Sequence, residues 1–88
     1  MTYRLRFTRK AHKQFAALDK YVQRKIQEYL NKYVHDNENP YAVGKRLAEN
    51  LQGYWRYRIG DYRIICEIKD DIFEVIAVKV GHRSKIYN

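Results

Sequence analysis

Three arginines, Arg56, Arg58 and Arg63, alternate with apolar residues in the stretch WRYRIGDYRIICEI. The alternation predicts two β-strands, and Gly60-Asp61 between them predicts a two-residue hairpin turn. In that register Arg58 faces Arg63, with about 5 Å between their Cβ atoms. Like charges this close repel each other unless an anion lies between them. The hairpin therefore predicts a surface that binds phosphate groups.

Two further residues could complete a site for RNA cleavage. RNA carries its own nucleophile, the 2′-hydroxyl, so cleavage needs only a base for its proton, an acid for the 5′ leaving oxygen and cations for the charge. His82 is the best acid or base by residue type, because histidine titrates near pH 6.5. Tyr87 could donate a proton or stack on a base. The sequence has no carboxylate cluster of metal-binding type, so we expect no metal and no other cofactor.

Simpler interpretations of these residues stay open. A row of arginines can be a solvated sheet face that keeps an exposed strand from aggregating, and a lone histidine such as His82 is often structural. We expect four apolar residues to share the arginine face: Ile65, Ile76, Val78 and Val80. Apolar neighbours of this kind favour a groove for bases or for a partner's helix over a simple solvated face.

The hairpin predicts a three-stranded antiparallel meander. A second tight turn at Asp70-Asp71 would lead into a β-branched strand over residues 72–80, which Gly81 would end. Continuing the register gives three expected pairs: Cys66 with Val75, Ile65 with Ile76 and Arg63 with Val78. The face opposite the arginines would be core, with the aromatic residues Trp55, Tyr57 and Tyr62 and the lone Cys66 as a small buried residue.

The first part of the chain predicts one strand and two helices. Residues 2–7 alternate as a short strand, possible at a sheet edge. Thr8 is a candidate N-cap for a helix of about ten residues, and Asp19 is a candidate cap for a second helix over residues 20–34. Their apolar stripes would pack on the sheet, which predicts an α+β fold.

Residues 35–46 have the composition of a loop. Pro40 would open a short turn of helix within it. The loop brings Lys45 and Arg46 close to the start of the first long strand, where we expect them to bind RNA.

Size and charge limit the class of protein. The 88 residues suffice for one domain, residues 1–88, and the formal net charge is +8 at pH 7. So basic a chain favours nucleic acid as a partner first and an acidic protein second. The sequence contains no apolar run long enough for a membrane span and no secretion signal. We therefore expect a cytoplasmic protein with no membrane partner.

The motifs resemble a known family. WRYRIGDYRIICEI, followed by an acidic turn, a hydrophobic strand and VGHRSKIY, resembles the RelE branch of the RelE/ParE superfamily of bacterial toxins, and the preceding KRLAENLQGYW is similar to the same family. The resemblance implies a RelE-like fold, with the helices on one face of a small sheet. It also implies a type II toxin that is neutralised by a cognate acidic antitoxin, enters the ribosomal A site and cleaves mRNA without a metal. Operator DNA would be bound only through the antitoxin complex.

The resemblance also implies site residues. By their positions in the motifs, the family's catalytic basic and aromatic residues correspond to Arg56, Arg58, Arg63, Arg83 and Tyr87, with His82 at a position that is basic in several relatives. Arginine stays charged and is a poor proton acceptor, so the general base stays open between His82, Lys45 and groups of the RNA or ribosome. Two other functions also stay open. One is a ParE-like DNA gyrase poison without nuclease activity, and the other is a degenerate toxin that acts only in an antitoxin-bound repressor complex.

Overall fold

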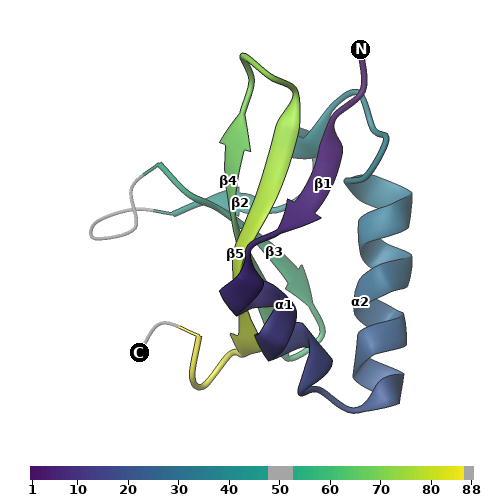
Figure 1. Ribbon diagram of the computed structural model, residues 1–88, viewed down its shortest axis with the longest axis vertical. Coiled ribbons are helices and arrows are strands. Elements are labelled where there is room, and N and C mark those ends of the chain that lie inside the picture. The colour runs from purple at the N-terminus through teal and green to yellow at the C-terminus, as the bar shows by residue number, and fades with distance from the viewer. Residues whose placement is uncertain (48–52, 87–88) are drawn as a thin grey trace.

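The structure is a computed structural model that describes residues 1–47 and 53–86 (Figure 1). Within these residues, five strands form one mixed sheet in the order β1-β5-β4-β3-β2. The elements in chain order are β1 (Arg4–Phe7), α1 (Arg9–Ala16), α2 (Lys20–Tyr33), a short 3-10 helix (Pro40–Ala42), β2 (Lys45–Arg46), β3 (Trp55–Ile59), β4 (Tyr62–Lys69) and β5 (Glu74–His82). This arrangement confirms the predicted α+β fold. None of the helices in the described residues is long and apolar enough to cross a membrane.

Both helices begin at the predicted caps. The Thr8 hydroxyl accepts a hydrogen bond from the backbone N–H of Ala11 at 3.1 Å, and the Asp19 carboxylate accepts one from Val22 at 3.0 Å. These bonds satisfy N–H groups that have no partner within the helix. Pro40 begins the 3-10 helix, as predicted.

The core lies between the helices and one face of the sheet. Ile26 and Leu30 of α2 pack in a single cluster with Tyr57, Ile64 and Val75 of the three long strands. Cys66 is fully buried in the same cluster, which confirms its predicted place, and burial raises the pKa of its thiol. Trp55, Tyr57 and Tyr62 belong to this side as well, as predicted. The main cluster of buried apolar side chains therefore lies on one face of the sheet.

The first hairpin has the predicted register, because Arg58 pairs with Arg63, and Arg56 with Ile65. The second hairpin does not. Its connection is longer than the predicted Asp70-Asp71 turn, since Lys69 pairs with Glu74 and Phe73 takes a positive φ of 53°. The longer turn shifts the register by two residues, so Cys66 pairs with Ala77 in place of Val75. A shift of two residues preserves the face to which each side chain points.

A β-bulge in β5 then reverses the faces. The register changes between Ile65 and Cys66, so Ile65 pairs with Lys79 instead of the predicted Ile76, and Arg63 pairs with Gly81 instead of Val78. Val80, predicted for the arginine face, is instead part of the core and only 3% exposed. A bulge inserts one unpaired residue, and beyond it the inward and outward positions exchange. Gly81 does not end the strand, which runs on to His82.

The edges of the sheet complete the arrangement. β1 pairs with β5 in parallel and forms one edge, in agreement with the edge position considered for residues 2–7. The opposite edge is β2, where Lys45 and Arg46 form a two-residue strand that the prediction of a loop missed. The predicted proximity of these two residues to the first long strand is confirmed.

Candidate nucleic-acid interface

Cations from all five strands of the described sheet project from the face opposite the helices. Residues paired directly across a sheet point to the same side. One cross-strand row contains Lys45, Arg56, Ile65 and Lys79, and the next contains Arg58, Arg63 and Gly81. We call this surface the basic face. It brings Lys45, which was predicted to bind RNA, together with the predicted catalytic arginines Arg56, Arg58 and Arg63. Arg46, also predicted to bind RNA, lies on the other side of β2.

Arg63 is oriented toward the hairpin turn. Its Nη1 donates hydrogen bonds to the backbone oxygens of Gly60 and Tyr62, both at 2.9 Å. Gly60 has a φ of +58°, the left-handed conformation that a two-residue turn requires and glycine adopts most easily. The turn therefore positions the guanidinium as well as connecting the strands.

Arg83 lies at the same turn. Its backbone N–H donates to the oxygen of Asp61 at 2.7 Å, and its Nε is 3.7 Å from an Asp61 carboxylate oxygen. These two side chains are 64% and 68% exposed, so the ion pair contributes little stability. A phosphate could compete for Arg83 at low cost. Arg63 and Arg83, 20 residues apart in sequence, thus converge on residues 60–62.

After β5 the C-terminal segment turns to the side opposite α2 (Figure 1), where Ile86 packs against Gly81. The backbone N–H of Ile86 donates to the oxygen of His82 at 3.0 Å, which closes a helical turn. Ile86 is 2% exposed, and its Cδ1 lies 3.4 Å from where a Cβ of Gly81 would be. Since Gly81 pairs with Arg63, this contact anchors the tail beside that arginine. Tyr87, the predicted catalytic tyrosine, lies outside the described residues.

His82 lies on the other side of the sheet. It pairs directly with Tyr62, and the two rings contact edge to face with 5.4 Å between centroids. Its Nδ1 accepts a hydrogen bond from the backbone N–H of Ser84 at 3.1 Å and lies 2.8 Å from the Ser84 hydroxyl. The structure therefore does not bring His82 into the cluster of Arg58 and Arg63.

Lys79 is a residue of the basic face that sequence reasoning missed. Regular alternation along residues 72–80 would place it on the core side, whereas the bulge places it beside Ile65, in the row that contains Arg56. The sequence contained a signal for this position, because a lysine buried in the core without a partner would cost much free energy. The conflict between a single lysine and the apolar alternation around it indicates an irregular strand.

The acidic residues of this face lie away from the turn and already contact cations. Glu74 accepts from Arg6 at 3.2 Å, and Glu67 lies 3.7 Å from Lys69. The register places them at the far end of the face, opposite the end that carries the hairpin turn. The positive charge at the turn is therefore not neutralised by them.

Gly44 and Trp55 position β2. The indole N–H of Trp55 donates to the oxygen of Val43 at 2.8 Å. Gly44 has a φ of +85°, and a Cβ there would be 2.5 Å from both the Arg56 oxygen and Trp55 Nε1. Only glycine allows so close an approach. This contact sets Lys45 opposite Arg56, at the edge of the basic face.

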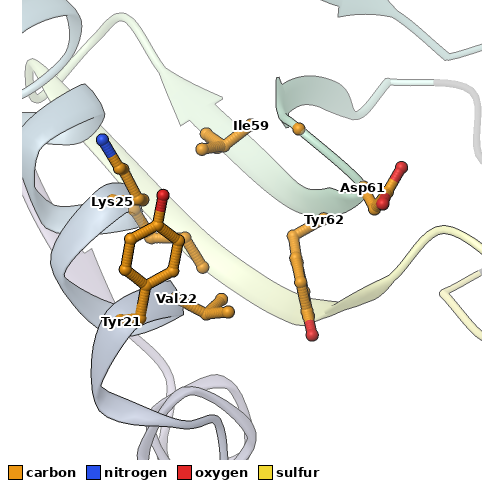
Figure 2. A pocket seen from close by; sticks show the side chains of 8 residues that line it. Tyr21, Val22, Lys25, Ile59, Asp61 and Tyr62 are labelled. Carbon is orange, nitrogen blue, oxygen red and sulfur yellow. The ribbon is translucent and has the colours of Figure 1, made fainter.

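A cleft of about 320 Å³ lies on the helix side of the Gly60-Asp61 hairpin turn. Figure 2 shows Tyr21 and Lys25 of α2 across this cleft from Tyr62 of the hairpin. Ile59 forms part of its apolar lining. The hairpin turn thus borders two different surfaces, one aromatic and apolar and the other cationic.

No group of three His, Cys, Asp or Glu side chains in residues 1–47 and 53–86 could hold a metal ion.

A small mixed sheet with two helices on one face is the fold that this chain shares with solved RelE toxins. The chain superimposes with a TM-score of 0.79 and 29% identity on a structure in the toxin-antitoxin complex RelBE2 from Mycobacterium tuberculosis, covering 94% of this chain and 100% of that one. The isolated E. coli RelE toxin gives a TM-score of 0.72 at 19% identity, covering 92% and 84%, which shows the shared fold.

Sequence comparison gives the family. The family described as "ParE toxin of type II toxin-antitoxin system, parDE" matches residues 5–87, and the chain belongs to it. It is also 31% identical over 87 residues to Toxin RelG of M. tuberculosis, covering 99% of this chain and 98% of that protein. Toxin RelE of the same organism is 37% identical over 49 residues, 56% of this chain and 50% of the relative. The protein is thus a type II toxin of the RelE branch of the RelE/ParE superfamily.

Proposed function

We propose that this toxin is an endoribonuclease that cleaves mRNA in the ribosomal A site and so inhibits translation. The observation that carries the proposal is the convergence of Arg63 and Arg83 on one hairpin turn, with Arg58 directly opposite Arg63. Three arginines at one end of the basic face suit a phosphodiester that gains negative charge during the reaction. Such an arrangement has no evident role in stability, since like charges in opposed strand positions repel.

The reaction is attack by the 2′-hydroxyl of the RNA on the adjacent phosphorus. The 2′ oxygen bonds to phosphorus while the bond from phosphorus to the 5′ oxygen breaks, which leaves a cyclic phosphate and a 5′-hydroxyl end. Arg56, Arg58 and Arg63 stabilise the charge of the pentacovalent state, and Arg83 holds a phosphate oxygen at the rim. Lys45 and Arg46 hold neighbouring phosphates.

The proton transfers fall to other groups. Since His82 contacts Tyr62 on the helix side, the proton acceptor is a lysine of the basic face, Lys45 or Lys79, or a group of the RNA or ribosome. Tyr87 is the proposed proton donor to the 5′ oxygen. It follows Ile86, which is anchored beside Arg63. The chemistry uses no metal and no cofactor.

The proposed partners follow from charge and from the relatives. The structural relative from M. tuberculosis was determined as a toxin-antitoxin complex. We infer that an acidic antitoxin neutralises this toxin by covering the basic face, and that operator DNA is bound only through that complex. The substrate is in the cytoplasm, and so is the toxin.

Primer extension on a defined mRNA tests the proposal. The message is incubated with purified toxin, with and without programmed ribosomes. We expect cuts within codons that require ribosomes, and a loss of about 10²- to 10³-fold in rate for Arg63→Ala. Arg24→Ala, at an exposed position of α2, is the matched control and should cut normally. Thermal unfolding and antitoxin binding check that both variants are folded.

One alternative function is supported by a specific observation, since the matching family carries the name ParE toxin. A ParE-like gyrase poison would arrest growth without cutting RNA. If the message stays intact with and without ribosomes while the toxin still arrests growth, the nuclease proposal is wrong. A DNA supercoiling assay with purified gyrase would then identify the poison.

A further inference from the structure

A second cleft, of about 260 Å³, lies at the β2 edge of the sheet, away from the hairpin turn. Its lining combines aromatic rings with one cation and one aliphatic side chain: Tyr41, Arg46, Gly53, Tyr54, Trp55 and Ile68. None of these except Arg46 has a part in the proposed cleavage. We call it the aromatic cleft.

The rings of this cleft are held in fixed orientations. Tyr41 and Trp55 meet at 89° with 5.0 Å between centroids. The Tyr41 hydroxyl donates to the carboxylate of Asp70, at 2.8 and 2.9 Å from its two oxygens, and the Trp55 indole N–H donates to Val43. Because their polar groups already have protein partners, these two residues offer the cleft mainly ring surface. Fixed aromatic surfaces favour a flat ligand, since little side-chain entropy is lost on binding.

The charge around the cleft connects it with the basic face. Lys45 pairs with Arg56 on the basic face, whereas Arg46 pairs with Trp55 on the opposite side. Successive residues of a strand point to opposite sides, so β2 carries one cation on each side of the sheet edge. Both side chains are exposed. A strand of nucleic acid that crosses this edge from the basic face therefore meets a cation on each side of it.

We propose that the aromatic cleft binds a nucleobase of the RNA, in a nucleotide that flanks the cleaved bond, while Arg46 contacts its phosphate. This inference rests on the proposed nuclease function. An apolar side chain of a protein partner would also fit a cleft of this size, but it would not need a cation at the rim. The net charge of +8 and the continuity of Lys45 and Arg46 favour RNA.

The sequence contains a single tryptophan, so tryptophan emission, excited at wavelengths that the nine tyrosines do not absorb, reports on this cleft alone. The purified toxin is titrated with a short single-stranded RNA in which every 2′-hydroxyl is methylated, so that no cleavage occurs. We expect saturable quenching of Trp55. An RNA of the same length with one abasic position, placed at each position in turn, should lose the quenching at one position and bind roughly tenfold more weakly there.

Two variants distinguish the contribution of the base to binding from that of the phosphate. Tyr54→Leu should reduce the quenching and the affinity, whereas Arg46→Gln should weaken binding roughly tenfold. The matched control Arg24→Gln removes the same charge from α2 and should change the affinity much less. The abasic series uses the unaltered toxin, so the test stands even if Tyr54→Leu fails to fold.

The outcomes distinguish the two proposals. If a labelled RNA saturates the toxin while Trp55 emission stays unchanged, the aromatic cleft is not a base site, although the basic face still binds RNA. The same conclusion holds if an antitoxin peptide quenches Trp55 and RNA does not, because the cleft then binds protein. If RNA quenches Trp55 but no message is cut on ribosomes, the base site stands and the nuclease proposal fails.

Discussion

The two faces of the sheet differ in what their side chains contact. On the helix-covered face, Tyr57 and Ile64 are fully buried against α2 and its neighbours. On the basic face, Arg58 is exposed and Arg83 makes one long ion pair at the surface. Burial of the main core cluster on the first face provides much of the stability, so the second can accumulate like charges that would be costly elsewhere. Stability and binding are thus assigned to opposite sides of the same strands.

The basic face is nevertheless not a simple solvated surface. Ile65, Ile76 and Ile86 are 2%, 4% and 2% exposed, and none of them belongs to the core cluster under the helices. The alternation along the strands predicted Ile65 and Ile76 on this face, and the register confirms both. Apolar residues beneath cations reduce the local dielectric, which strengthens the attraction of the arginines for a phosphate.

The largest expected effect on stability is for Ile64→Ala, on the covered face. This substitution should reduce the free energy of unfolding by about 2–5 kcal/mol, because it leaves a cavity in a closed core. Urea unfolding measures the change. Arg58→Ala, one strand away on the basic face, is the control and should shift the stability by less than about 1 kcal/mol. Equal losses in the two variants would contradict the division between the faces.

Gly44→Ala should destabilise the β2 edge. The new Cβ would be 2.5 Å from the Arg56 oxygen and from the Trp55 indole, at a φ of +85°. We expect a loss of at least about 2 kcal/mol and weaker RNA binding through Lys45 and Arg46. Gly60→Ala is the control: it also has a positive φ, but nothing lies within 4 Å of its Cβ, so strain alone should cost about 1 kcal/mol. Thermal unfolding distinguishes the two, and similar losses would show that the close contact is unimportant.

Alkaline pH should destabilise the fold through two tyrosines, Tyr41 at the β2 edge and Tyr57 in the core. Burial and the hydrogen bond to Asp70 raise the pKa of Tyr41 to about 12, and burial raises the pKa of Tyr57. Below about pH 10 both tyrosines are neutral in the folded and unfolded states, so their contribution is fully present. Above pH 10 the unfolded chain loses these protons while the folded chain keeps them, so stability falls as the pH rises toward 12. Urea midpoints between pH 8 and 11.5 test this, and Tyr41→Phe should make the decline shallower; a flat profile would contradict it.

The smallest expected effect on stability is for Arg58→Gln. Removing one of two opposed like charges should stabilise the protein slightly, by about 0.2–1 kcal/mol, and the gain should shrink at high salt. RNA cleavage should fall in the same variant. Urea unfolding at two salt concentrations, with primer extension alongside, measures both. A variant that loses stability would indicate that Arg58 is structural and would weaken the contrast between the faces.

Local sequence signals were sufficient for much of the site. The two-residue turn at Gly60-Asp61 and the alternation around it predicted the pairing of Arg58 with Arg63 correctly. The caps Thr8 and Asp19 and the buried Cys66 were also predicted correctly. All of these depend on residues close together in the chain, or on an apolar pattern with a single period. The resemblance to RelE toxins was likewise visible in the sequence motifs.

Tertiary structure alone decided the register of β5 and the members of the basic face. The turn before β5 contains Phe73 at a positive φ, a conformation that residue type does not predict. β5 also pairs with β1, which is distant in sequence, and accommodates a bulge that turns Lys79 outward and Val80 inward. One extra residue moves every later side chain of the strand to the opposite face of the sheet. The alternation of inward and outward positions therefore cannot be extrapolated past a bulge. For this reason the sequence by itself determined the arginine hairpin, and only the packed sheet decided that Lys79 joins it and that His82 does not.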